Sequence, residues 1–138
     1  MSVVASLRTR LFGISPEEIT VAKRGFRVDD PRRIQQLEGV GGSFLAGYHA
    51  VMTDTDPTAI AAALDPMPDM WRGFAYEGAG MALAILDRLT PWRHRVRDFL
   101  EGPGNDHLYM VYVGVGWALA RLAFKVEPLM DRYEPIWR

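Results

Sequence analysis

The sequence predicts an all-α fold. Helix-start signals recur along the chain, no segment alternates polar and apolar residues for long enough to indicate a strand, and one helix-like segment occurs twice. The chain has 138 residues, of which 49% are hydrophobic, enough for one domain with a substantial core. We therefore expect a single helical domain over residues 1–138, with about seven helices.

The helix starts combine a polar capping residue with a proline, which is tolerated in the first helical turn. Ser15 and Pro16 begin the first, and Glu18 completes a capping box. Later starts of this kind are Asp30–Pro31, Asp56–Pro57 and Thr90–Pro91. Pro68 precedes the first copy of the repeated segment, Asn105 or Asp106 caps the second, and KVEPLMDRY predicts a last short helix.

The repeated segment reads YEGAGMALAIL from Tyr76 and YVGVGWALARL from Tyr112, with seven of eleven positions identical. The second copy contains strand-forming residues, but the Ala, Leu and Met of the first copy favour a helix for both. Each copy has two glycines, and four helical glycines together cost about 4 kcal/mol. We expect the two helices to be a pseudo-symmetric pair that touches through these glycines. Alternatively, one small-residue face leaves room for a ligand.

The two copies differ where they carry charge. Glu77 corresponds to Val113, and Arg121 corresponds to Ile85. Glu77 shares a helical stripe with small residues, and His107 and Arg121 lie on a different stripe, on the second helix, where they bracket a glycine. Because a buried charge is costly unless it is paired, these residues indicate either structural ion pairs and exposed positions or a polar cavity of ligand size.

Composition excludes several classes of function. The chain has no cysteine, so it has no disulfide or thiolate site, and its net charge of −1 gives no general attraction to nucleic acid or anionic membranes. The three histidines lack metal-site spacing, so we expect no metal and no cofactor. The N-terminus is not a signal peptide, and the longest nearly uncharged run is short of the roughly 20 residues of a spanning helix. We expect a cytoplasmic protein.

Two further motifs are ambiguous. The GVGG of Gly39–Gly42 follows a helix rather than a strand, so we interpret it as a helix break or another close-packing point. The basic run WRHRVR is a solvated face or an alternative anion site, through Arg93 or Arg97.

Four segments together resemble an actinobacterial family of proteins of unknown function, DUF1702. They are LFGISPEEITVAKRGF, LEGVGGSFLAGYHA, RGFAYEGAGMALAILDRLTPW and HLYMVYVGVGWALARL. Members are encoded among genes for specialised metabolites and are typically about twice this length, with a second half that looks like a diverged copy of the first. The resemblance therefore implies half of a duplicated fold, with a second half-length homologous subunit as partner in a heterodimer. It also suggests a two-subunit enzyme that forms an aziridine ring in antibiotic biosynthesis by displacing sulfate within its substrate.

This reaction would use a carboxylate to bind and deprotonate an amine, and cationic groups to hold sulfate. Glu77 is the candidate catalytic residue. Candidates for binding a small sulfated amino substrate are Arg121, His107, Arg72, Tyr76, Tyr112 and Trp117. Two other interpretations remain open: a non-catalytic structural subunit, and a binding module for an apolar metabolite.

Overall fold

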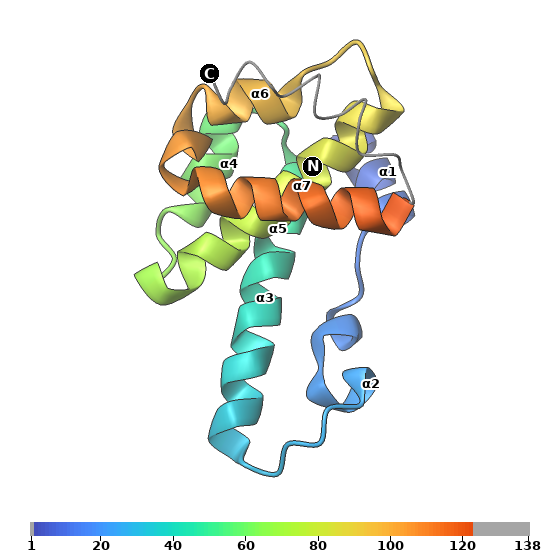
Figure 1. Cartoon of the computed structure of the whole chain (residues 1–138). Coiled ribbons are helices and arrows are strands. Elements are labelled where there is room, and N and C mark those ends of the chain that lie inside the picture. Colours follow the sequence, from blue (N-terminus) through green and yellow to red (C-terminus); the bar gives the residue numbers. More distant parts are fainter. Residues whose placement is uncertain (1, 123–138) are drawn as a thin grey trace.

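The computed structural model describes residues 2–122, which fold into seven α-helices and two short 3-10 helices (Figure 1). The three longest are α3 (Pro31–Thr53), α5 (Asp69–Leu89) and α7 (Leu108–Leu122). The shorter elements are α1 (Val3–Phe12), η1 (Pro16–Ile19), α2 (Val21–Arg24), α4 (Pro57–Leu64), α6 (Arg95–Leu100) and η2 (Pro103–His107). The described residues contain no strand, which confirms the predicted all-α class.

Helix α5 lies between α3 and α7. It crosses α3 on one side and α7 on the other (Figure 1). At the α3–α5 crossing the backbones touch at one glycine from each helix. A Cβ on Gly47 would collide with the carbonyl oxygen of Ala75, and a Cβ on Gly78 would collide with that of Phe44. Each of these carbonyls lies three positions before the glycine of its own helix. The contact is therefore reciprocal, and the crossing has a local two-fold relation.

The α5–α7 crossing follows the same rule. A Cβ on Gly80 would collide with the carbonyl oxygen of Val111, and a Cβ on Gly114 would collide with that of Glu77. Again each carbonyl lies three positions before the glycine of its own helix. The prediction that the repeated helices touch through their glycines is confirmed.

The assignment of two glycines was wrong. Gly78 contacts α3 and not the second copy of the repeat, and no described atom outside its own helix lies within 4 Å of a Cβ on Gly116. The reason is helical geometry: residues two apart point about 200° away from each other. Gly78 and Gly80 therefore serve opposite sides of α5, and Gly116 points away from the side of α7 that Gly114 uses.

The hydrophobic core forms around α5, which is buried along most of its length. Helices α4 and α6 close it with Leu64, Val96 and Phe99. The amino-terminal elements attach to α3 by three hydrogen bonds. Tyr48 Oη donates to the Phe12 carbonyl at 2.7 Å, the Ile14 amide donates to His49 Nε2 at 3.2 Å, and the Val21 amide donates to Glu38 Oε1 at 3.0 Å.

Of the predicted helix starts, those at Asp30, Asp56 and Pro68 are found where they were expected. Asp30 and Asp56 cap α3 and α4, each with proline in the first turn. Ser15 caps only the 3-10 helix η1. Helix α1, capped by Ser2, was not predicted. The helix expected in KVEPLMDRY lies outside the described residues.

Three predicted boundaries are corrected. Thr90 ends α5 instead of beginning the next helix, and its hydroxyl donates to the Leu86 carbonyl at 2.8 Å. Asn105 and Asp106 lie within η2, which leads directly into α7. The GVGG segment is not a helix break, because it lies inside α3. Gly39 packs on the Trp71 ring, and Gly41 packs on Ile19.

The crossings predict a contrast between two glycines of α3. Gly47→Ala should lower the free energy of unfolding by about 1–3 kcal/mol or more, because the added methyl group enters the Ala75 carbonyl. Gly42→Ala, whose methyl group would meet only Ile19 Cδ1 at 3.9 Å, should instead raise it by up to about 1 kcal/mol through helix propensity. Denaturant unfolding measures both. Equal effects of the two substitutions would contradict the backbone contact.

Candidate functional site

A long apolar groove lies between the amino-terminal half of α3 and the start of α5. Its volume is about 610 Å³, and α3, α5 and the segment before α3 supply its walls. The lining residues are Val28, Arg33, Gln36, Leu37, Val40, Met70, Trp71 and Phe74. Leu37 and Met70 are 45% and 62% exposed, which is unusual for large apolar side chains inside a helix pair. The groove is therefore an open, mostly apolar surface.

Glu77 lies one turn beyond Phe74 on α5, where α7 crosses α5, but it is not among the residues that line the groove. It follows Met70 and Phe74 on one face of α5, seven and three positions later. The indole Nε1–H of Trp117 on α7 donates to Glu77 Oε1 at 2.7 Å. The candidate catalytic residue Glu77 and one of the candidate binding residues, Trp117, are thus brought together by the same crossing that places Gly114 on the Glu77 backbone.

The surroundings alter the acidity of Glu77. Partial burial beside apolar side chains raises the pKa of its carboxyl group, because desolvation disfavours the charged form, and the Trp117 hydrogen bond opposes part of that rise. The group is half-buried, so it remains accessible to a ligand. A carboxylate with a raised pKa is a better proton acceptor than an ordinary surface glutamate.

A second group of predicted residues gathers on another side of α5. The Tyr76 ring stacks on His107 with centroids 4.0 Å apart and on Phe99 at 5.6 Å. Its hydroxyl donates to Asp65 Oδ1 at 2.7 Å, and burial together with this partner raises the pKa of Tyr76. Tyr76 is buried, so this cluster serves packing.

Arg72 has a structural position as well. Its Nη2 donates to the Met67 carbonyl at 2.8 Å, and its Nη1 pairs with Asp69 at 2.9 Å, which together fix the turn before α5. The hydroxyl of Tyr112 on α7 has a raised pKa because it is desolvated. Neither residue lines the apolar groove.

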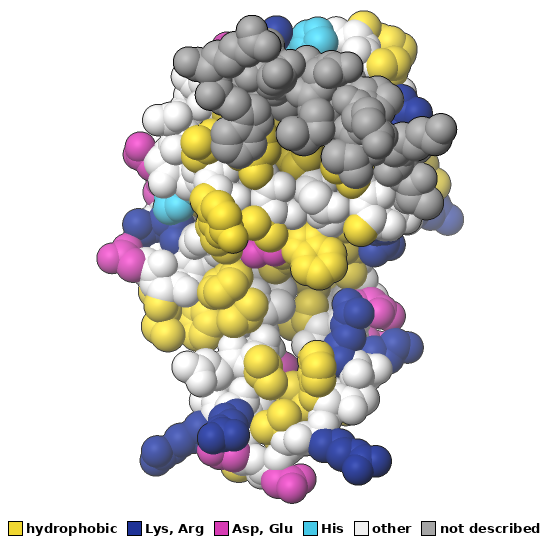
Figure 2. All heavy atoms as spheres, in the orientation of Figure 1, with side chains coloured by type: hydrophobic (Ala, Val, Ile, Leu, Met, Phe, Trp, Pro, Cys, Tyr) yellow, Lys and Arg dark blue, Asp and Glu magenta, His cyan; other side chains and the backbone are white. Residues whose placement is uncertain are grey.

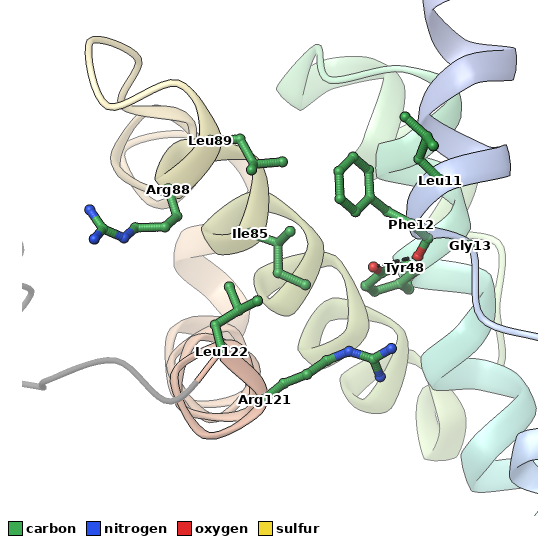
Figure 3. Close-up of a pocket in the computed structure, with 9 residues that line it drawn as sticks. All are labelled: Leu11, Phe12, Gly13, Tyr48, Ile85, Arg88, Leu89, Arg121 and Leu122. Atoms are coloured by element: carbon green, nitrogen blue, oxygen red, sulfur yellow. Dashed lines mark hydrogen bonds between the residues drawn. The ribbon is translucent and has the colours of Figure 1, made fainter.

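Arg121 lies at a different hollow, of about 160 Å³, between α1, α3, α5 and α7 (Figure 3). Its side chain reaches toward Tyr48, and its positive charge opposes the rise that burial causes in the pKa of that tyrosine. This hollow shares no lining residue with the groove. Among the described residues, no salt bridge joins Arg121 to Glu77.

The helix start within WRHRVR is capped by a carboxylate of the protein, which contacts Arg95, whereas the prediction named Arg93 or Arg97. Asp87, buried to 1% exposure, accepts from the Arg95 and Val96 amides at 2.9 and 3.1 Å. It also pairs with the Arg95 guanidinium at 3.5 Å. The start of α6 is thus capped from within the protein.

Sequence reasoning missed the groove itself. The signal was present, because Met70 and Phe74 repeat at four residues beside Leu37 and Val40, which repeat at three. What could not be foreseen was that these two apolar faces converge without a further helix to cover them. Among the described residues, no three His, Asp or Glu side chains gather as metal ligands.

Comparison with known proteins bears on the family. The model of the family "Protein of unknown function (DUF1702)" matches residues 3–136. The chain belongs to the DUF1702 family. No curated protein and no solved structure matches it significantly. Within the part of this DUF1702 protein that the structure describes, no helix is both long and apolar enough to span a bilayer.

The hydrogen bond from Trp117 predicts a measurable shift in the acidity of Glu77. Trp117→Phe removes the donor that stabilises the carboxylate, so the pKa of Glu77 should rise further above its ordinary value of 4.5. NMR titration of the labelled side-chain carboxyl measures it. Trp92→Phe is the matched control, because Trp92 is 74% exposed and lies outside the groove. An equal shift of the Glu77 pKa in both variants would show that the Trp117 hydrogen bond does not stabilise the carboxylate.

The same raised pKa sets the sign of a stability effect. A carboxyl group whose pKa is higher in the folded state contributes stability below its unfolded pKa, near 4.5, and loses it as pH rises through the folded value. Glu77→Gln removes this titration. The free energy of unfolding of the wild type should therefore fall relative to the variant between about pH 4 and neutral pH. Parallel pH profiles for the two proteins would show that Glu77 is not desolvated.

Proposed function

We propose that this DUF1702 protein is a subunit of a natural-product biosynthetic enzyme that closes an aziridine ring by intramolecular displacement of sulfate. The observation that carries the proposal is the half-buried Glu77 carboxylate with its raised pKa, one turn beyond Phe74 of the apolar groove. The groove would hold the apolar part of the substrate, and the carboxylate would bind its ammonium group.

The reaction step balances without an oxidant or reductant. The amine gives its proton to the Glu77 carboxylate, and the freed nitrogen attacks the neighbouring carbon that bears the sulfate ester. The new C–N bond forms as the C–O bond breaks, and the bonding electron pair leaves with sulfate. The raised pKa of Glu77 supports its role as the base. Holding the chain so that nitrogen, carbon and oxygen are in line would supply much of the acceleration.

The proposal assigns only the amine half of this reaction to the described residues. Arg121 lies in a separate hollow, and Arg72 fixes the turn before α5. We propose that the cation that meets the departing sulfate comes from a second subunit. This division explains why a carboxylate here has no arginine or lysine partner within salt-bridge distance among the described residues.

A binding module without chemistry is the second candidate, and the apolar lining of the groove favours it. The two functions differ in what Glu77 does. In a binding module the carboxylate would only select an amine-bearing ligand, and its replacement would weaken binding without any reaction to lose. In the enzyme, replacement removes turnover even where the ligand still binds.

We expect Glu77→Gln to fold normally and to lose at least about 10²-fold of the turnover of an amine that carries a sulfate ester on the adjacent carbon. Sulfate release measures turnover, and calorimetry with the unsulfated amine measures binding. Glu101→Gln, at an exposed position on the other side of the fold, is the matched control. Near-normal turnover in Glu77→Gln would eliminate Glu77 as the base. Wild-type protein that neither releases sulfate nor binds the amine would overturn both candidate functions.

A further inference from the structure

The face of α7 that points away from α5 has no partner among the described residues. Gly114 faces α5, and Gly116 is turned about 200° from it. Gly116 is exposed, and no described atom outside α7 lies within 4 Å of a Cβ placed there. A glycine at an open position weakens a helix, unless a close approach makes use of it.

Gly116 belongs to a continuous uncharged stripe, which we call the outer stripe of α7: Tyr109, Val113, Gly116 and Ala120. These residues recur at four, three and four positions, the spacing of a seam between two helices. Tyr109 is 78% exposed, and Trp117 at the margin of the stripe is 54% exposed. Figure 2 looks onto this side of the molecule, where hydrophobic side chains gather over α7 and charged side chains border them.

The outer stripe carries the pattern that forms both crossings inside the protein. The pattern is a glycine together with the backbone carbonyl three residues before it. In α3 these are Gly47 and the carbonyl of Phe44, and in α5 they are Gly80 and the carbonyl of Glu77. In α7 the same positions are Gly116 and Val113, and Gly80 and Gly116 correspond in the sequence repeat. Among the described residues, helix α7 is therefore the last of three stacked helices and keeps the feature that would attach a fourth.

We propose that the outer stripe of α7 is the interface of a two-fold dimer, in which α7 of one copy crosses α7 of a second copy. Each internal crossing is reciprocal, because the glycine of either helix meets the carbonyl three residues before the glycine of the other. Such a contact is complementary to itself, as an isologous interface requires. Gly116 of each copy would meet the Val113 carbonyl of the other. A second copy therefore provides both the glycine and the carbonyl that such a crossing requires.

Charge and chemistry favour this occupant. The outer stripe contains no residue that is charged at neutral pH, so two copies of it meet without like-charge repulsion. The exposed Tyr109 and Trp117 lie where they would extend the contact beyond the crossing point, and aromatic residues are enriched in such interfaces. The interface continues the glycine stack α3–α5–α7 by the same geometry. It does not depend on the proposed enzymatic function.

The test is the oligomeric state of the full chain. Wild-type protein should be a concentration-dependent dimer in sedimentation equilibrium, and Gly116→Leu should be a monomer, because its side chain holds the two backbones apart. The variant should keep its helical circular dichroism, since no other part of residues 2–122 lies against this position. Ala62→Leu, at an exposed position of α4, makes a similar change elsewhere and should remain dimeric.

A second measurement keeps the proposal falsifiable if Gly116→Leu folds poorly. The chain has no cysteine, so Val113→Cys introduces a single thiol next to the proposed two-fold axis. It should form a disulfide-linked dimer much faster than Ala62→Cys. A monomeric wild type, a dimer unaffected by Gly116→Leu, equal cross-linking of the two cysteine variants, or pairing only with a different related chain would each overturn the second-copy interface.

Discussion

The close approach of α5 to the helices on both of its sides is the contact on which the rest of this fold depends. Two glycines only two positions apart remove the side chains on opposite faces of one helix, so α3 and α7 both reach its backbone. Helical glycines are costly in isolation. Here they are offset by dense backbone packing at two crossings, and the surrounding Ala, Leu and Ile side chains of α5 complete the core.

Local signals in the sequence predicted the helices well, because a capping residue followed by proline acts within one turn. The starts at Asp30 and Asp56 needed no tertiary information, whereas Thr90 carried the same signal and failed. Its hydroxyl instead bonds back to the Leu86 carbonyl, and buried Asp87 supplies the cap of the next helix. The choice between these outcomes depends on packing around Asp87, which no short window of sequence contains.

For the candidate site, the sequence identified a carboxylate amid small residues and an aromatic residue that contacts it. It could not show which of the cationic residues lie near that carboxylate. The sequence placed Glu77 and Arg121 on stripes of the two repeated helices, and these helices cross instead of running side by side. Crossing helices share contacts over a short length, so Glu77 meets Trp117 while Arg121 passes on toward Tyr48. The crossing also uses the backbone of Glu77 itself, which fixes the position from which its side chain departs.

The order of the crossings has a consequence for biosynthesis of the protein. Helix α3 pairs with α5, and α5 pairs with α7, so each crossing joins helices that are neighbours among the long helices of the chain. The first crossing is complete in sequence at Leu89, well before Leu108 begins the last described helix. A nascent chain leaving the ribosome can therefore assemble two thirds of this layer during translation, and α7 needs only to close onto an existing surface.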